Sequence, residues 1–501
     1  MLLLRKIFFY SFLVIYLILC PLIIFYALGI TFRPKTQTLL KTGLIHITTI
    51  PDGAKIYINR RIWKEKTPSS IRNLIPGEYW LQLSKRDYQT WSRLLPVVEE
   101  KATTLENIIL IPKVWPSKAL LSRTFENLIP LEGEPFLLLK NGASLKDHFI
   151  FSLSQGSNSP FRQNNPSASG SLKLLKPIDI VDTLSEKMKI KRFFSVKKSP
   201  FLLLEIEDGW NVYRYFWVNL RSDASPSKEV TSLFPKPPQE VIWGHDQDHI
   251  LFSRDGETIT QIDTQMMSAY AKIIQKVHGF TVFNDQLYVL TSDHILKRFN
   301  YTDQAPEILL DDKQLSRELF GKDQDWQIHI LAPSLMIFTN KDGALISDQL
   351  PYLLMEKGVK GFSFDKQNER LLIWTNNQIA IIDFVKSSEE TSFEKGPRVT
   401  FLMGKGKRIE QAFWIEKTPY VLFRDNNRVY LLEAFTDLPD PQIQQIPGLI
   451  TRSFISYSSR DGLLFFLDAE TKKLSFIEIL PSEDVRDMLL EEKKVKEKNA
   501  L

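Results

Sequence analysis

The chain of 501 residues carries 64 basic and 59 acidic residues, a formal net charge of only +5. Because these charges are mixed along the chain, neither a nucleic acid nor a strongly acidic partner is indicated. The single cysteine, Cys20, excludes a disulfide or a cysteine-based metal site within one chain. Aromatic residues make up 12% of the chain and short β-branched runs are frequent, so we expect a mainly β fold.

The first predicted element is an uncharged segment, residues 7–30, which follows a short basic tail, residues 1–6. As a helix it would reach roughly 36 Å at about 1.5 Å per residue, enough to cross a hydrocarbon core of about 30 Å. We therefore predict a single-pass transmembrane helix over residues 7–30. A cleaved signal peptide is the alternative, and lipoprotein processing at Cys20 is disfavoured because Leu19 precedes it.

The charges beside this segment do not choose its orientation in a membrane. Arg5 and Lys6 precede it, whereas Arg33, Lys35 and Lys41 follow it closely. With the terminal amine included, the positive-inside rule gives a tie. The side on which the body lies must therefore be argued from the next part of the chain.

A small all-β domain is predicted over residues 43–112, after a polar linker formed by residues 31–42. Two alternating stretches flank the turn Pro51-Asp52-Gly53-Ala54, and another pair of strands follows Pro76-Gly77. About six strands are expected, arranged as a small sandwich.

The order of motifs in this region resembles the PEGA domain, a short all-β module named for its Pro-Glu-Gly-Ala turn. The motifs in chain order are Pro51-Asp52-Gly53-Ala54, Lys55-Ile56-Tyr57-Ile58-Asn59, Lys66-Thr67-Pro68, Leu74-Ile75-Pro76-Gly77-Glu78-Tyr79 and Lys85-Arg86-Asp87-Tyr88. Asp52 departs from the family's Glu, and Arg60 and Asp87 stand where the family commonly has Gly. Those two positions require either a negative φ or a tolerated left-handed conformation.

The resemblance implies a module similar to surface-layer-associated domains, without known catalytic residues and often placed beside a membrane anchor. It therefore favours an extracytoplasmic location for the body of the protein. A generic β module is the alternative interpretation, and it would remove this argument about localisation.

The long body, residues 113–481, repeats one pattern of an aromatic strand, an apolar strand, a tight turn and a further strand. The apolar strands begin 36 to 65 residues apart, with a mean near 47, which is close to the period of a four-stranded propeller blade. They are Phe136-Leu139, Phe201-Leu204, Ile250-Phe252, Leu287-Leu290, Leu335-Phe338, Leu371-Trp374, Tyr420-Phe423 and Leu463-Phe466.

Segments such as Gly361-Phe362-Ser363-Phe364-Asp365 followed by Leu371-Leu372-Ile373-Trp374 resemble repeats of WD40-like and TolB-like β-propellers. The resemblance implies a propeller of seven or eight blades, and a pair of stacked β-sandwiches is the alternative. Polar stretches at 154–171, 222–239 and 386–397 are interpreted as loops, the first of them disordered. Residues 482–501 are expected to form a charged helical or disordered tail.

No motif in the chain predicts catalytic, cofactor-binding or metal-binding residues, and ligand-binding residues stay unassigned. The best metal-like cluster, His245-Asp246-Gln247-Asp248-His249, lies between strands, where its members would point to opposite faces, so a polar turn is favoured. Gly404-Lys405-Gly406-Lys407 lacks the spacing and the hydroxyl of a phosphate loop. The basic stretch Lys187 to Lys198 is explained by a strand with a solvated face.

These observations favour a membrane-anchored, extracytoplasmic and non-catalytic protein that binds or scaffolds a cell-envelope protein or polysaccharide. No cofactor is expected, and the oligomeric state is not indicated. An enzyme that acts on envelope glycans is one alternative, which acidic residues with perturbed pKa values at the propeller channel would favour. A scaffold that faces the cytoplasm is the other.

Overall fold

The computed structural model describes most of the chain between residues 38 and 480, together with residues 9–20 and 30–33. Within the long stretch the description leaves out residues 132–135, 143, 154–169, 175–186, 196–200, 209, 211, 221–227, 235, 245–248, 301–305, 311–319, 321–324, 350–351, 385–397, 436–437, 439 and 460–461. Residues 481–501, which include the predicted charged tail at 482–501, lie outside the described part.

The described part of the predicted membrane segment is a helix over residues 9–20. Its side chains are mostly exposed, and the neighbouring residues 1–8 and 21–29 lie outside the description. Among the residues described, no helix combines the length and the apolar character needed to cross a membrane.

A two-stranded hairpin replaces the last residue of the predicted helix and most of the predicted polar linker. Strand β1 (Ile30–Arg33) pairs antiparallel with β2 (Thr38–Lys41), so Ile30 is extended rather than helical. Strand β2 and all but the first residue of β1 therefore lie within the predicted polar linker, 31–42. The β-branched Ile30 and Thr31 favour the extended backbone, which a count of polar residues does not detect.

Residues 43–109 form two facing sheets that we call the module. One sheet has the order β6-β3-β9 and the other β5-β4-β7-β8, with β3 and β9 parallel and the remaining pairs antiparallel. Their bounds are β3 (Gly43–Ile50), β4 (Lys55–Ile58), β5 (Arg61–Lys66), β6 (Ser69–Leu74), β7 (Gly77–Ser84), β8 (Trp91–Val97) and β9 (Ala102–Ile109).

Alternating burial places one face of each sheet in a common core. Along β3 every second side chain is buried, and Ile45 and Ile47 have no exposed surface. They pack with Ile56, Leu81 and other apolar residues of the facing sheet. The hydrophobic alternation of the sequence therefore fixes which face of each strand is inside.

The turns of the module explain its departures from the PEGA pattern. Gly53 has φ +85°, the left-handed conformation that favours glycine, directly after Asp52. Arg60 and Asp87 adopt φ values of 67° and 68°, so the left-handed conformation is retained at both positions without glycine. Each such residue costs of order 1 kcal/mol or more, which the surrounding strands must offset.

The body consists of eight four-stranded antiparallel sheets in its described residues. The first sheet contains β11 (Asn127–Pro130), β12 (Phe136–Lys140), β13 (His148–Leu153) and β14 (Gly170–Leu174), and the second contains β15 (Lys189–Ser195), β16 (Phe201–Glu207), β17 (Tyr213–Asn219) and β18 (Lys228–Glu229). The third sheet contains β19 (Glu240–Trp243), β20 (Ile250–Asp255), β21 (Thr258–Asp263) and β22 (Ser268–Gln275), and the fourth contains β23 (Val277–Phe283), β24 (Gln286–Thr291), β25 (Leu296–Asn300) and β26 (Glu307–Leu310).

The next four sheets complete the set. The fifth sheet contains β27 (Trp326–Ala332), β28 (Leu335–Asn340), β29 (Leu345–Ser347) and β30 (Leu353–Met355), and the sixth contains β31 (Gly361–Asp365), β32 (Arg370–Trp374), β33 (Ile379–Asp383) and β34 (Arg398–Met403). The seventh sheet contains β35 (Ile409–Ile415), β36 (Tyr420–Asp425), β37 (Arg428–Glu433) and β38 (Ile443–Ile450), and the eighth contains β39 (Ser456–Ser458), β40 (Leu463–Leu467), β41 (Lys473–Glu478) and β10 (Lys118–Thr124). Short 3-10 helices occupy η1 (Leu145–Asp147) and η3 (Thr231–Leu233).

Every apolar strand predicted from the sequence lies in the second strand of one of these sheets, from Phe136 in β12 to Leu463 in β40. The loops predicted at 154–171 and 222–239 are partly wrong. Strand β14 begins at Gly170, inside the first, and β18 and η3 lie inside the second. Both errors arise because polar residues are acceptable on the outer strand of a sheet, where one side chain in two faces water. Residues 154–169 and 386–397 lie outside the described part.

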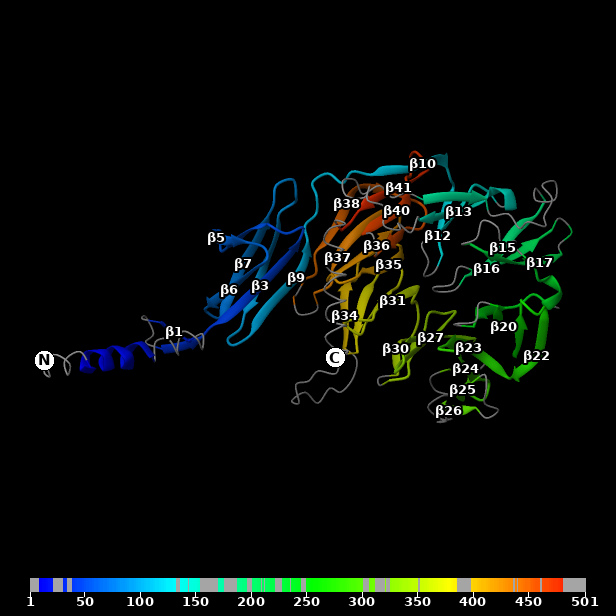
Figure 1. Cartoon of the computed structure of the whole chain (residues 1–501), viewed down its shortest axis with the longest axis horizontal. Coiled ribbons are helices and arrows are strands. Elements are labelled where there is room, and N and C mark those ends of the chain that lie inside the picture. The colour runs from blue at the N-terminus through cyan, green and yellow to red at the C-terminus, as the bar shows by residue number, and fades with distance from the viewer. Residues whose placement is uncertain are drawn as a thin grey trace.

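The eight sheets form a propeller-like ring. Each sheet shares a hydrophobic core with the next, and the eighth shares one with the first through contacts among Phe125, Phe149, Phe465 and their neighbours. The last sheet takes its outer strand, β10, from the start of the body, where it pairs with β41. Figure 1 shows the sheets following one another around the body, with β10 beside β41. The separate sheets differ from the two facing sheets of the sandwich alternative.

Candidate functional site

The junction between the module and the body is built on a buried ion pair. Strand β8 carries Trp91 and Arg93 on its inward face, and Glu433 ends β37 of the seventh sheet. Trp91 Nε1 donates a hydrogen bond to Glu433 Oε1 at 2.5 Å, and Arg93 donates to Glu433 Oε2. Arg93 Nη2 also donates to the carbonyl of Asp440 at 2.9 Å. One carboxylate of the body thus holds two side chains of the module.

Burial dominates the electrostatics of this pair. The Arg93 and Glu433 side chains are only 7% and 3% exposed. Burial raises the pKa of Glu433, and the bonds from Trp91 and Arg93 counteract this only in part. A buried pair of this kind contributes little net stability, but removing one partner is costly because the other charge stays buried.

Apolar packing and further hydrogen bonds surround the ion pair. Leu438 and Phe435 of the body pack against the core of the module. Gln442 Nε2 donates to the carbonyl of Ser92 at 2.8 Å, and Asn107 Nδ2 donates to the carbonyl of Lys417 at 2.8 Å. Figure 1 shows β9 of the module beside the body near β37. The module is therefore docked on the body rather than tethered to it.

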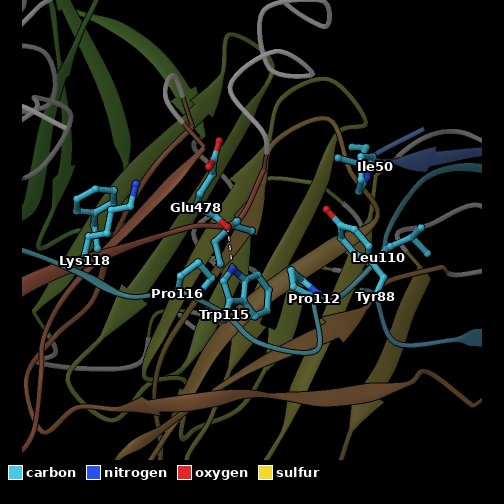
Figure 2. A pocket seen from close by; sticks show the side chains of 11 residues that line it. Ile50, Tyr88, Leu110, Pro112, Trp115, Pro116, Lys118 and Glu478 are labelled. Atoms are coloured by element: carbon cyan, nitrogen blue, oxygen red, sulfur yellow. Dashed lines mark hydrogen bonds between the residues drawn. The ribbon is translucent and has the colours of Figure 1, made fainter. Parts of the chain in front are cut away.

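A small cavity lies along the same junction, where the chain passes from the module into the body. It has a volume of about 170 Å³ and is lined mainly by apolar residues, among them Ile50, Leu110 and Pro112. Figure 2 shows Trp115 beside Pro116, with its Nε1 donating to the carbonyl of Glu478 at 2.8 Å. Since ligand sites usually exceed roughly 300 Å³, this cavity is better explained as a packing gap between the module and the body.

A larger cavity of about 430 Å³ lies where the innermost strands of four neighbouring sheets begin, and we call it the basic cavity. Its lining comes from sheets six, seven, eight and one, and consists of Asn127, Lys360, Asn376, Arg408, Ile409, Glu410, Arg424, Arg452 and Phe454. Four of these side chains are cations and one is a carboxylate. The volume lies within the usual range of small-molecule sites.

One wall of the basic cavity is formed by residues 451–455, which precede β39 and alternate between buried and exposed side chains. Thr451, Ser453 and Ile455 are buried, while Arg452 and Phe454 are exposed. Gln411 holds the backbone of Ile455 through two hydrogen bonds, of 2.8 and 3.2 Å. Ser453 Oγ accepts from the amide of Leu128 at 2.6 Å. The wall is therefore fixed to both neighbouring sheets, with Arg452 and Phe454 on its open side.

A second part of the lining is fixed by a carboxylate that bonds to backbone amides. Asp425 accepts hydrogen bonds from the amides of Lys407 and Arg408, at 3.0 and 2.6 Å. The amide of Ile409 in turn donates to the carbonyl of Asn376 at 2.8 Å. These bonds position the start of β35, and with it the Arg408 side chain that lines the cavity.

The lining of the cavity includes one acidic residue, Glu410. Glu410 lies at a bulge in β35, opposite β36, and pairs with both Arg424 and Arg408. A bulge of this kind turns a side chain away from the regular alternation of the strand. Burial lowers the pKa of Arg424. The side chain of Arg424 is 3% exposed, and its guanidinium lies 5.8 Å from the centre of the Phe454 ring.

A related cluster lies at the start of the third sheet. Arg254 of β20 pairs with Glu240 at 3.5 Å and with Asp325 at 2.9 Å. Burial raises the pKa of Glu240 to about 7, which Arg254 opposes and Asp325 favours. Neither cavity described above includes Glu240 in its lining.

Sequence reasoning missed both of these arginines, although a signal for them exists. Arg254-Asp255 and Arg424-Asp425 each precede a hairpin turn, at Gly256 and at Asn426. The sequence predicts a tight turn in each repeat, and the Arg that recurs before this turn is the additional signal. Its recurrence at one place in the repeat indicates a position at the same edge of the ring.

The clusters that the sequence singled out form no site in the described part of the chain. His249 is the one described member of the cluster 245–249, and its carbonyl accepts from Thr264. No group of three potential metal ligands was found among the described residues. Gly404 to Lys407 leads into the basic cavity at Arg408, and the described part of the basic stretch 187–198 includes β15, where Arg192 pairs with Glu205.

Comparison with known proteins identifies the module. Residues 42–109 match the PEGA domain, which confirms that resemblance. A search of curated proteins gives no significant match.

Several solved structures share low similarity with the chain. The β-propeller domain of Cps50 (Swd1) from Myceliophteria thermophila is 11% identical, with 58% of this chain and 96% of that chain covered and a TM-score of 0.34. PorZ, a surface component of the type-IX secretion system of Porphyromonas gingivalis, is 13% identical, with 71% and 43% covered and a TM-score of 0.35. The computationally designed protein Ika8 is 10% identical, with 72% and 98% covered and a TM-score of 0.41.

Proposed function

We propose that this chain is a membrane-anchored, extracytoplasmic and non-catalytic binding or scaffolding protein. In this proposal the apolar segment 7–30 is the anchor, the PEGA module lies next to it, and a WD40- or TolB-type propeller of eight blades is presented to a cell-envelope protein or polysaccharide. The buried bonds of Glu433 to Trp91 and Arg93 are the observation that carries the proposal. Through these bonds the module holds the ring in one orientation.

A fixed orientation matters for a protein that binds while it is attached to a surface. A tethered ring would sample many directions, and a partner would have to restrict that motion on binding. Docking through a buried pair and a shared core removes this cost before binding. The loops and cavities at the ends of the ring then stand at a fixed angle to the module.

The experiment that tests this proposal combines surface proteolysis with capture. We expect protease added to intact cells to cleave the ring, and affinity capture of the full-length protein after crosslinking in cells to recover an envelope protein or polysaccharide. Cleavage only after lysis would overturn the extracytoplasmic location and favour the cytoplasmic scaffold. Loss of the protein from the membrane fraction under alkaline wash would overturn the anchor.

An enzyme acting on envelope glycans is the second candidate, and Glu240 is the specific observation that favours it. A carboxyl group whose pKa is raised to about 7 is suited to general acid catalysis near neutral pH. Hydrolysis of an envelope glycan by the purified protein, lost in a Glu240→Gln variant, would replace the binding proposal with this one.

A further inference from the structure

The side chains that line the basic cavity carry an excess of positive charge. Its lining contains Lys360, Arg408, Arg424 and Arg452 but a single carboxylate, Glu410, a formal excess of three positive charges. Glu410 is already paired with Arg424 and Arg408. Among the described residues, no acidic side chain forms an ion pair with Lys360 or Arg452. The cluster around Arg254 differs, because Glu240 and Asp325 both balance that cation.

The backbone that carries two of these cations is fixed by hydrogen bonds. Arg452 projects from a wall whose neighbours Thr451 and Ser453 are buried and bonded, and Arg408 from a backbone fixed by Asp425. Fixing the backbone in advance reduces the entropy that ordering would otherwise cost. Concentrated positive charge in a concave site also attracts anions over a distance of about 10 Å at ordinary salt concentrations.

The remaining lining is suited to a hydroxylated ring rather than to a bare ion. Asn376 and Asn127 supply amide groups, which can bond to hydroxyls, although Asn127 Oδ1 already accepts from Ser453 Oγ at 2.6 Å. The Phe454 ring is 40% exposed and offers an apolar face. The volume of about 430 Å³ also leaves room for far more than one phosphate or carboxylate group.

From this combination we infer that the basic cavity binds an anionic saccharide, with a carboxylate or phosphate group on Arg408 and Arg452 and the sugar ring against Phe454. The inference rests on the proposed binding function and names the ligand class for it. Arg side chains suit this role because their planar fork can donate two parallel hydrogen bonds to one oxyanion.

The test measures binding to the purified full-length protein in detergent by titration calorimetry. One pair of probes is a glucuronate-containing tetrasaccharide and the same tetrasaccharide with its carboxylates reduced to hydroxyls. The other pair is glucose 6-phosphate and glucose. We expect the anionic member of each pair to bind at least about tenfold more tightly, and its affinity to fall as salt is raised.

Variants locate the site. Arg452→Gln should weaken binding of the anionic probes by about tenfold, because the side chain is exposed and its loss leaves the buried anchors of the wall in place. Arg86→Gln is the matched control, since it removes one exposed positive charge from the module and should leave binding unchanged. Circular dichroism and the unfolding midpoint establish that both variants fold.

Several results would overturn the inference. Equal affinity for the neutral and anionic probes would show that charge is not recognised. Equal affinity for inorganic phosphate and glucose 6-phosphate would show that the sugar ring is not recognised. Tighter binding of a single-stranded DNA oligonucleotide would show that the cavity is a nucleic-acid site. Equal weakening by Arg452→Gln and Arg86→Gln would place binding elsewhere. None of these results contradicts the proposed binding or scaffolding function, because surface proteolysis and capture test that function separately.

Discussion

At the residue scale, two related arginines have opposite surroundings. Arg254 and Arg424 occupy equivalent places before a hairpin turn, and each guanidinium pairs with a glutamate on the neighbouring inner strand. Around Arg254 a second acid, Asp325, is balanced by a second cation, Lys341, which pairs with it at 3.5 Å. Around Arg424 the additional neighbours are cations instead. The same local element therefore produces a neutral cluster in one part of the ring and a basic cavity in another.

The raised pKa of Glu240 makes stability depend on pH. The folded pKa of about 7 lies above the ordinary value of 4.5, so between these pH values the native state holds a proton that the unfolded chain has released. The free energy of unfolding therefore falls as pH rises from about 4.5 to about 7, by up to about 3 kcal/mol. The nearest charged groups are Arg254 and Asp325.

Urea unfolding at pH 5 and pH 7.5 measures this effect. Relative to the wild type, a Glu240→Gln variant should lose less stability between the two pH values, because its side chain does not titrate. Since other groups titrate equally in both proteins, the difference between them isolates Glu240. Identical losses in the two proteins would contradict the assignment.

At the element scale, the close approach of two inner strands depends on one glycine. Strands β23 and β27 lie so near each other that a Cβ atom added at Gly279 would be 2.1 Å from the carbonyl oxygen of Trp326. Because the clashing atom belongs to the backbone, it cannot rotate away as a side chain would. We expect Gly279→Ala to reduce the free energy of unfolding by about 1–3 kcal/mol or more.

A second glycine provides the control for this substitution. Nothing lies within 4 Å of a Cβ atom added at Gly404, in the loop before β35. Gly404→Ala should change the free energy of unfolding by no more than about 0.5 kcal/mol. Chemical denaturation of both variants checks the pair, and equal effects would show that the strands do not approach as closely as described.

At the scale of the whole molecule, the ring is closed by a strand from its beginning. Strand β10 precedes the first sheet in the sequence but completes the eighth, where Ala119 lies opposite Ser475. Directly opposite residues on antiparallel strands have Cβ atoms about 4.5–5.5 Å apart, so a small adjustment permits a disulfide. Closing so long a loop would stabilise the fold by about 6 kcal/mol on the chain-entropy estimate.

This closure can be tested in a Cys20→Ser background. Ala119→Cys combined with Ser475→Cys should form a disulfide on mild oxidation and raise the thermal midpoint under non-reducing conditions. Ala119→Cys combined with Ser456→Cys is the control, because β39 lies at the opposite edge of the same sheet. A disulfide in the control pair, or none in the first pair, would contradict the closure.

Much of the fold could be predicted from hydrophobic pattern. The strands that contain the eight apolar runs are the second strands of eight sheets, where both faces are covered by neighbouring sheets and continuous apolar sequence is required. Outer strands such as β14 and β18 could not be predicted because their polar residues are also typical of loops. The module was identified by its turns, and the family match supports it.

The candidate site could not be predicted in this way. The residues of the basic cavity are spread between Asn127 and Phe454 in the sequence, and its four cations come from three different repeats. No spacing rule connects Lys360 with Arg452, because the distance between them is set by the angle between neighbouring sheets. The partnership of Arg93 with Glu433, 340 residues later, is hidden for the same reason.

By itself the sequence determined the mainly β character of the chain, the order of its strands and the PEGA module, because local alternation and turn chemistry are properties of neighbouring residues. Only the tertiary structure decided that the module is docked on the body, that β10 closes the last sheet, and that four cations surround one cavity. Those features depend on contacts between residues far apart in the chain, and such contacts exist only once the sheets have packed into a ring.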